Sequence, residues 1–262
     1  MVLKSYFDGG NKEIPGEYDR LTLSVVSGTS EQWESFDVSW KNILDKHKAS
    51  YLHTTDAVSL QNKFSTENGW SKETVDSLIM DCVGVIEKHI YIENVRQGLC
   101  PVTITIPLDD YARAKQANDK LPNTAADICA TESLSFVFKW GKYIGAESYE
   151  LYFDQGEPFY GHILDRKQNK KSIKCITLME KITQLCKCNA QQVYAMQIAD
   201  LFAWCINHND NATRNWHRKL NDLKSWWSPI LDYEHLLYPM EGVLDLVKSW
   251  KLPERRRIYT ML

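Results

Sequence analysis

Alternating apolar and polar residues near the start of the chain predict a β-hairpin. Residues 5–10, Ser-Tyr-Phe-Asp-Gly-Gly, form one predicted strand, and residues 21–27 alternate in the same way until Gly28. A polar turn with Pro15 and Gly16 separates the two segments. Antiparallel pairing is the simplest way to join strands that lie this close in sequence.

Longer segments with apolar residues at helical spacing predict helices. They cover residues 30–48, 71–89, 125–143, 159–164 and 193–208, with a tryptophan-rich helical tail at 211–250. Further strands are predicted at residues 102–106 and 149–154. The shorter predictions are an extended piece at 51–56, a basic connector at 166–174, and a short helix or turn marked by Leu178 and Ile182.

This order of elements predicts a single mixed α/β domain over residues 1–262. A helical insertion is expected at about residues 30–98 and a helical C-terminal extension at about 211–262.

Composition narrows the class of protein. The net charge of −3 gives no overall basic character, so nucleic-acid binding would need a local basic patch. The seven cysteines are irregularly spaced and contain no Cys-x-x-Cys pair, which argues against a structural zinc. Free thiols predict a reducing, cytoplasmic environment. The first strand is expected directly after residues 1–4, which leaves no room for a signal peptide, and the sequence has no apolar run of the roughly 20 residues that a membrane span needs.

Two apolar strands end in an aspartate, which is the first sign of a site. Asp8 is followed by two glycines, and Asp154 is followed by Gln155 and Gly156. A carboxylate at the end of a buried strand must be paired, hydrogen-bonded or bound to a metal, because burying it alone is prohibitive.

Two helices add acids in apolar surroundings. Gln197 and Asp200 are three residues apart and share one face of an otherwise apolar helix. Glu132 lies on the helix that leads into the Asp154 strand. Taken singly, Asp200 is equally explained as a hydrogen-bonded buried acid and Glu132 as a solvated one, so the four acids together carry the prediction of a divalent-metal site.

The four acids occur along the chain on a strand, a helix, a strand and a helix, in the order Asp, Glu, Asp and Asp. In this order the chain resembles the ribonuclease H-like superfamily. It is most similar to an uncharacterised bacterial branch, domain-of-unknown-function family 3800, through Asp8, the motif Tyr51-Leu52-His53 and the motif Gln197-Ile198-Ala199-Asp200. The chain departs from that family in having Gly9 where its members carry Glu.

The resemblance implies a mixed central sheet flanked by helices and a two-metal phosphodiesterase site. Asp8, Glu132, Asp154 and Asp200 would bind two Mg²⁺ or Mn²⁺ ions, since these ions prefer carboxylate oxygens. His53 or His208 would transfer a proton, although both are equally explained as surface or helix-end residues.

Local basic segments are candidates for substrate binding. The connector after Asp154 contributes Arg166, Lys167, Lys170 and Lys171, and a later segment contributes Arg214 and Arg218. With Gln197 they would contact RNA or DNA, but a solvated loop and a packed helix explain the same residues. The expected function is a metal-dependent nuclease. One alternative is a non-catalytic relative that binds nucleic acid or a protein partner, and another is a different metal-dependent hydrolase that uses the same acids on a small phosphate ester. The tryptophan-rich tail is a candidate homodimer surface.

Overall fold

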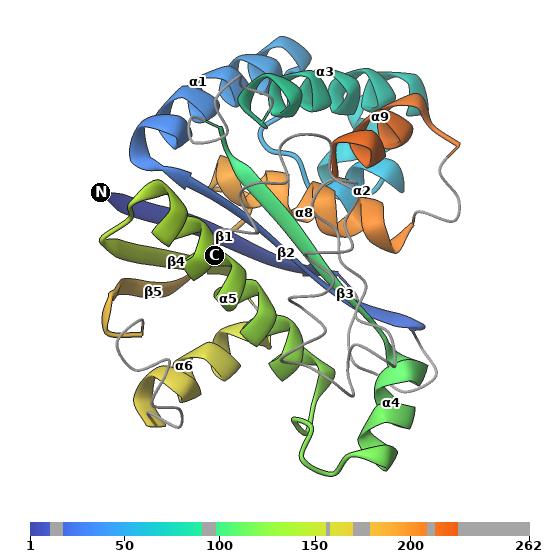
Figure 1. Cartoon of the computed structure of the whole chain (residues 1–262). Coiled ribbons are helices and arrows are strands. Elements are labelled where there is room, and N and C mark those ends of the chain that lie inside the picture. Colours follow the sequence, from blue (N-terminus) through green and yellow to red (C-terminus); the bar gives the residue numbers. More distant parts are fainter. Residues whose placement is uncertain (11–17, 91–97, 156–157, 170–178, 209–212, 225–262) are drawn as a thin grey trace.

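A computed structural model describes residues 1–10, 18–90, 98–155, 158–169, 179–208 and 213–224 (Figure 1). Within them, five strands form one mixed sheet in the order β3-β2-β1-β4-β5. The strands are β1 (Val2–Gly10), β2 (Arg20–Thr29), β3 (Cys100–Pro107), β4 (Ser148–Asp154) and β5 (Ile182–Cys188).

The strand directions divide the sheet into two parts. β1 and β2 form the expected antiparallel hairpin, and β3 adds antiparallel to β2. β4 pairs parallel to β1, and β5 pairs parallel to β4. The carboxyl ends of β1, β4 and β5 therefore meet at one edge of the sheet.

One face of the sheet packs on α5 (Ala125–Ile144) and α6 (Phe159–Asn169). Side chains at alternate strand positions, among them Leu3, Phe7, Leu151 and Phe153, form a core with these helices. Thr124 caps the N-terminus of α5, because its side chain accepts a hydrogen bond from the backbone N–H of Asp127.

The other face is covered by α8 (Tyr194–Asn207), which crosses β1 and β2. Helices α1 (Ser30–His47), α3 (Lys72–Ile90) and α9 (Asn215–Lys224) lie over α8 as an outer layer, visible at the top of Figure 1. The short helices α2 (Thr54–Val58), η1 (Asn62–Phe64) and η2 (Thr66–Asn68) connect α1 to α3. Because α8 is covered on both sides, it is apolar around most of its circumference.

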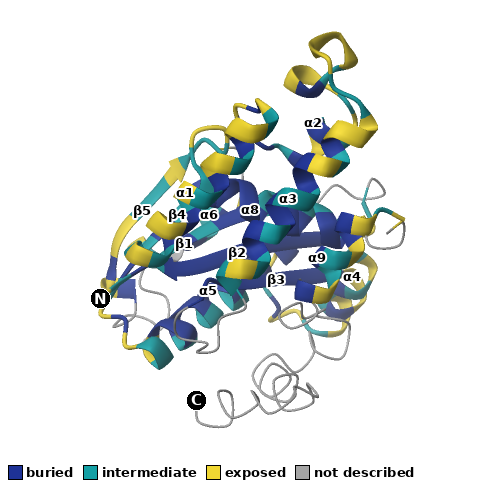
Figure 2. Ribbon diagram, turned by 90° about the horizontal axis from the view of Figure 1, so that it is seen from above, coloured by how far each residue is buried: buried dark blue, intermediate teal, exposed yellow. Residues whose placement is uncertain are grey.

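The burial pattern follows these layers. Figure 2 shows the strands as a mostly buried sheet between helices whose outer sides are exposed. Among the described residues, no helix has both the length and the apolar character needed to span a membrane. The free thiols in the same part of the chain are Cys82, Cys100, Cys129, Cys186, Cys188 and Cys205.

The predictions of secondary structure were correct for the main helices and the first four strands, and wrong in four places. In the segment marked by Leu178 and Ile182, residues 179–181 are helix and turn as predicted, but Ile182 begins strand β5. Helix α6 continues to Asn169 into the predicted connector. Helix α2 begins at Thr54, within the segment expected to be extended. Helix α4 (Leu108–Ala117) was not predicted at all. Of the predicted helical tail, only α9 falls within the described residues.

Candidate active site

Asp8 and Asp154 lie at the same edge of the sheet because their strands are parallel neighbours. The register pairs Phe7 with Phe153, and the two rings stack at 4.4 Å between centroids in the α5 core. Successive strand residues point to opposite faces. The residue after each phenylalanine therefore points to the face covered by α8. Asp8 is 6% exposed there, and Asp154 is half-buried.

Cys188 lies beside Asp154, with Asp8 on the next strand beyond β4. It ends β5 and pairs in register with Asp154. The Asp154 carboxylate accepts a hydrogen bond of 3.2 Å from the backbone N–H of Ala190, the second residue after that strand. Burial and, after it, the neighbouring Cys186, Asp154 and Asp8 raise the pKa of the Cys188 thiol to about 12. Asp8 and Asp154 thus act on one thiol from two strands.

Asp200 approaches the same edge from α8. Its carboxylate accepts two hydrogen bonds from Thr54, 2.7 Å from the backbone N–H and 2.8 Å from the hydroxyl. Burial raises the pKa of Asp200, the His53 ring and the Thr54 hydrogen bonds lower it, and the nearby Asp154 raises it further. The structure therefore places Asp200 close enough to Asp154 for their charges to interact.

The two candidate histidines have different surroundings. His53 is the N-cap residue of α2, and its Nδ1 lies 3.1 Å from the carboxylate of Asp56. It is close enough to Asp200 to influence the pKa of that carboxyl group. His208 follows α8, where Nδ1 donates to the backbone carbonyl of Trp204 and the two rings stack at 4.1 Å between centroids. The described contacts favour His53 over His208 as a neighbour of the acids.

Glu132 lies on α5, and this helix packs on the opposite face of the sheet from α8. Its side chain is half-buried. Its membership of the carboxylate set stays a prediction.

Gln197 is hydrogen-bonded to three other segments of the chain, and its predicted contact with a substrate stays a prediction. The side chain is fully buried. Its amide oxygen accepts hydrogen bonds of 2.9 Å from Trp40 Nε1 and from the backbone of Leu52, and its amide nitrogen donates to the carbonyl of Ala190 at 3.1 Å. These bonds tie α8 to α1, to the segment before α2 and to the loop that contacts Asp154.

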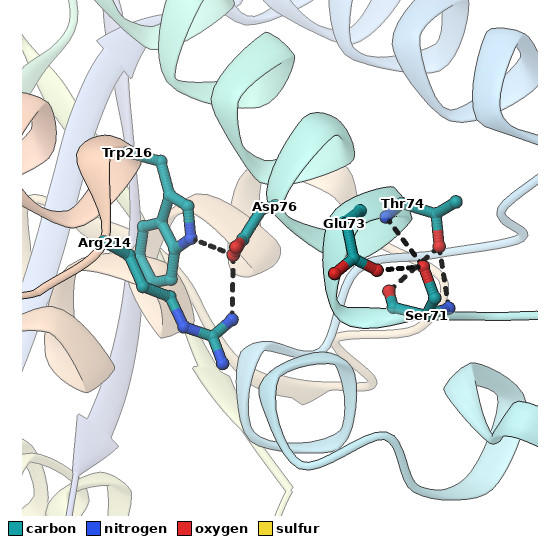
Figure 3. A network of polar contacts seen from close by, with 6 residues as sticks. All are labelled: Ser71, Glu73, Thr74, Asp76, Arg214 and Trp216. Carbon is teal, nitrogen blue, oxygen red and sulfur yellow. Dashed lines mark hydrogen bonds and ion pairs between the residues drawn. The ribbon is translucent and has the colours of Figure 1, made fainter.

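Two predicted substrate-binding cations have structural partners. Arg214 pairs with Asp76 of α3 at 2.8 Å, and the indole N–H of Trp216 donates to the same carboxylate oxygen, as Figure 3 shows. These contacts attach α9 to α3, beside the N-terminal turn of α3, where Ser71, Glu73 and Thr74 bond to one another. Lys167 donates to the backbone carbonyl of Ile182 and so joins α6 to β5.

The other basic candidates are less constrained by the structure. Arg218 is exposed on α9 and donates to Asn215. Lys170, Lys171 and the side chain of Arg166 lie outside the described residues. Their contact with a substrate stays a prediction.

Sequence reasoning missed three residues near the candidate site: Thr54, which binds Asp200, Asp56, which pairs with His53, and Cys188, which lies beside Asp154. His53 and Asp56 are three residues apart at the start of a helix, and this spacing was the local sequence signal that the two side chains could meet. Cys188 carried no signal, because its strand was not predicted.

A preformed metal centre is not seen in the part of the chain that the structure describes, where no group of three or more His, Cys, Asp or Glu side chains is placed to hold an ion. The donor set at this edge nevertheless consists of carboxylate oxygens, the ligands that Mg²⁺ and Mn²⁺ prefer. Comparison of the chain with family models, curated proteins and solved structures finds no match.

Proposed function

We propose that this protein is a divalent-metal-dependent nuclease of the ribonuclease H-like type. The observation that carries the proposal is the parallel register of β1 and β4, which sets Asp8 beside Asp154 at the carboxyl ends of neighbouring strands. Asp200, which interacts electrostatically with Asp154, adds a third acid from a helix on that face.

The topology supports the assignment of the fold. Strands β1, β2 and β3 pair antiparallel, β4 and β5 run parallel to β1, and helices pack on both faces, which agrees with the mixed central sheet flanked by helices that the resemblance implies. The four acids fall in the expected order along these elements. A ribonuclease H-like fold is therefore the finer description that we propose for the mixed α/β sheet.

Each residue of the site has a proposed role. Asp8, Asp154 and Asp200, with Glu132, would hold Mg²⁺ or Mn²⁺. When bound, two such ions supply an activated water and stabilise the leaving oxygen of a phosphodiester. Thr54 fixes the Asp200 carboxylate through its two hydrogen bonds, and His53 exchanges a proton with the reacting group. The substrate that this chemistry suits is RNA or DNA.

Metal-dependent stabilisation tests the site directly. We expect Mg²⁺ or Mn²⁺ to raise the melting temperature of the wild type, since an ion that binds only the folded protein stabilises it. Asp8→Asn and Asp154→Asn should each abolish that rise, whereas Asp119→Asn, a change at an exposed loop residue, should leave it unchanged. Absence of metal stabilisation in the wild type, together with higher stability of the two site variants, would refute the metal site.

Cleavage of single-stranded, duplex and hybrid substrates tests the activity. We expect metal-dependent cleavage by the wild type that is lost in both site variants. Cleavage that survives both substitutions contradicts the mechanism. Binding of nucleic acid without cleavage would instead support the non-catalytic alternative, which the presence of Gly9 in place of the family's Glu favours.

A further inference from the structure

The backbone around His53 is fixed to α8 on both sides. The N–H of Leu52 donates to Gln197, and the N–H of Thr54 donates to Asp200. These acceptors lie three residues apart on one helix, about one turn. His53 therefore has a defined position beside Asp200, even though its own side chain is 42% exposed.

The orientation of the ring depends on a second contact. His53 Nδ1 lies 3.1 Å from Asp56 Oδ2, and the Asp56 side chain is only 13% exposed. At this ion-pair distance, the negative charge of the Asp56 carboxylate favours a proton on Nδ1 over a lone pair there. In a neutral imidazole the proton on one nitrogen leaves the other as the acceptor. In a neutral ring, Asp56 thus favours the tautomer in which Nε2 carries the lone pair.

We propose that Asp56 is the positioning residue of His53, holding the Nδ1–H tautomer so that Nε2 exchanges a proton with the reacting group beside Asp200. The chemical consequence rests on the proposed nuclease function. The tautomer itself does not, and it can be measured in the protein without substrate. Asp56 itself contacts no reacting atom.

The competing explanation is that Asp56 serves α2 alone. It lies in the first turn of this helix, where a negative charge is favourable next to free backbone N–H groups. Loss of stability in an Asp56 variant would fit either role. Only the tautomer of His53 and the kinetics separate them.

The test combines side-chain ¹⁵N–¹H spectroscopy with kinetics on the full chain at one pH at which histidine is neutral. Wild type, Asp56→Ala, Asp56→Glu and the matched control Thr55→Ala, an exposed neighbour in α2, are compared. His53→Gln identifies the His53 signals. Backbone spectra verify that each variant is folded.

We expect His53 to be protonated on Nδ1 in the wild type and in Thr55→Ala, and to shift to the Nε2–H tautomer in Asp56→Ala. In Asp56→Glu, a carboxylate of similar reach should restore the Nδ1–H form in part. If cleavage is observed, Asp56→Ala should lower kcat about tenfold or more with little change in KM, because loss of positioned acid–base catalysis lowers the rate and not the binding.

A wild-type ring protonated on Nε2, or a tautomer that Asp56→Ala leaves unchanged, overturns the proposal. If Asp56→Ala does not fold, the tautomer of His53 in the wild type and in Asp56→Glu still tests the proposal. The expected tautomers in a protein that cleaves no nucleic acid would sustain the positioning role and refute the nuclease function alone.

Discussion

Gln197 connects three segments of the chain through one buried amide. Its partners are Trp40 in α1, the backbone of Leu52 and the backbone of Ala190, which lie far apart in sequence. Buried polar groups are costly when they lose their partners. The side chain is therefore important for the relative placement of His53, Asp154 and Asp200, although it touches none of them through a described contact.

Replacing Gln197 by alanine should destabilise the protein strongly. Two buried donors and one acceptor lose their partner, so we expect a loss of about 2–5 kcal/mol in the free energy of unfolding. Urea denaturation measures the change, with Gln192→Ala at an exposed position of the preceding loop as the control. Equal stabilities of the two variants would show that the three hydrogen bonds contribute nothing.

Asp37 should make the stability depend on pH. Its Oδ1 is buried without a hydrogen-bond partner among the described residues, and burial raises its pKa to about 6, against the opposing effect of Lys4. Because the folded state then holds the proton more tightly than the unfolded state, the free energy of unfolding falls as the pH rises from about 4 to about 6.

The substitution Asp37→Asn should remove this pH dependence. We expect a gain of about 1 kcal/mol at pH 7, a value reduced for partial exposure to solvent, and a flatter profile between about pH 4 and 6. Denaturation at several pH values measures it, and Glu34→Gln, at an exposed position of the same helix, is the matched control. A stability that rises through this window in the wild type, and is unaffected by Asp37→Asn, would contradict the prediction.

At the scale of elements, two helical glycines differ in what surrounds them. A Cβ at Gly84 of α3 would meet nothing within 4 Å, whereas a Cβ at Gly141 of α5 would lie 2.4 Å from the ring of Tyr149. Tyr149 is held in β4 with 1% exposure. Helix α5 approaches the sheet closely only because this position has no side chain.

The same change, glycine to alanine, should therefore have opposite effects in the two helices. Gly84→Ala should stabilise by about 0.5–1 kcal/mol through helix propensity. Gly141→Ala should destabilise by about 1–2 kcal/mol, because the clash with Tyr149 outweighs that gain. Thermal or urea unfolding of both variants makes the comparison, and effects of the same sign would contradict the packing described for α5.

At the scale of the whole molecule, α8 is fixed against the sheet at its C-terminal end. Asn207 accepts a hydrogen bond of 2.7 Å from the hydroxyl of Thr22 on β2, and its amide nitrogen would lie 1.9 Å from a Cβ at Gly10. This junction sets how α8 lies across β1, and hence where Asp200 lies relative to Asp8.

Gly10→Ala should disturb this junction. Because Asn207 is held by Thr22, we expect a loss of about 1–3 kcal/mol and a smaller stabilisation by Mg²⁺ or Mn²⁺. In a double-mutant cycle, Gly10→Ala should cost less when Asn207→Ala is already present, because the side chain that meets the new Cβ is gone. An equal cost in both backgrounds would show that the junction does not limit the approach of α8.

The sequence was sufficient to predict elements whose residues repeat with a clear period. β1, β2, α1, α3, α5 and α8 were predicted because their apolar residues recur at strand or helix spacing, or cover most of the element as in α8, and such patterns are local properties. Strand β5 was missed, since it lies at the edge of the sheet with mixed exposure and has no regular alternation.

The sequence by itself determined that Asp8 lies near the end of one strand, that Asp154 ends another and that Asp200 lies on a buried helix, because strand ends and helical faces follow from near neighbours in the chain. Only the tertiary structure decided which side chains meet. Thr54 reaches Asp200 across 146 residues, and Gln197 and Arg214 are engaged by protein partners. Such contacts depend on strand register and helix packing, which no local pattern encodes.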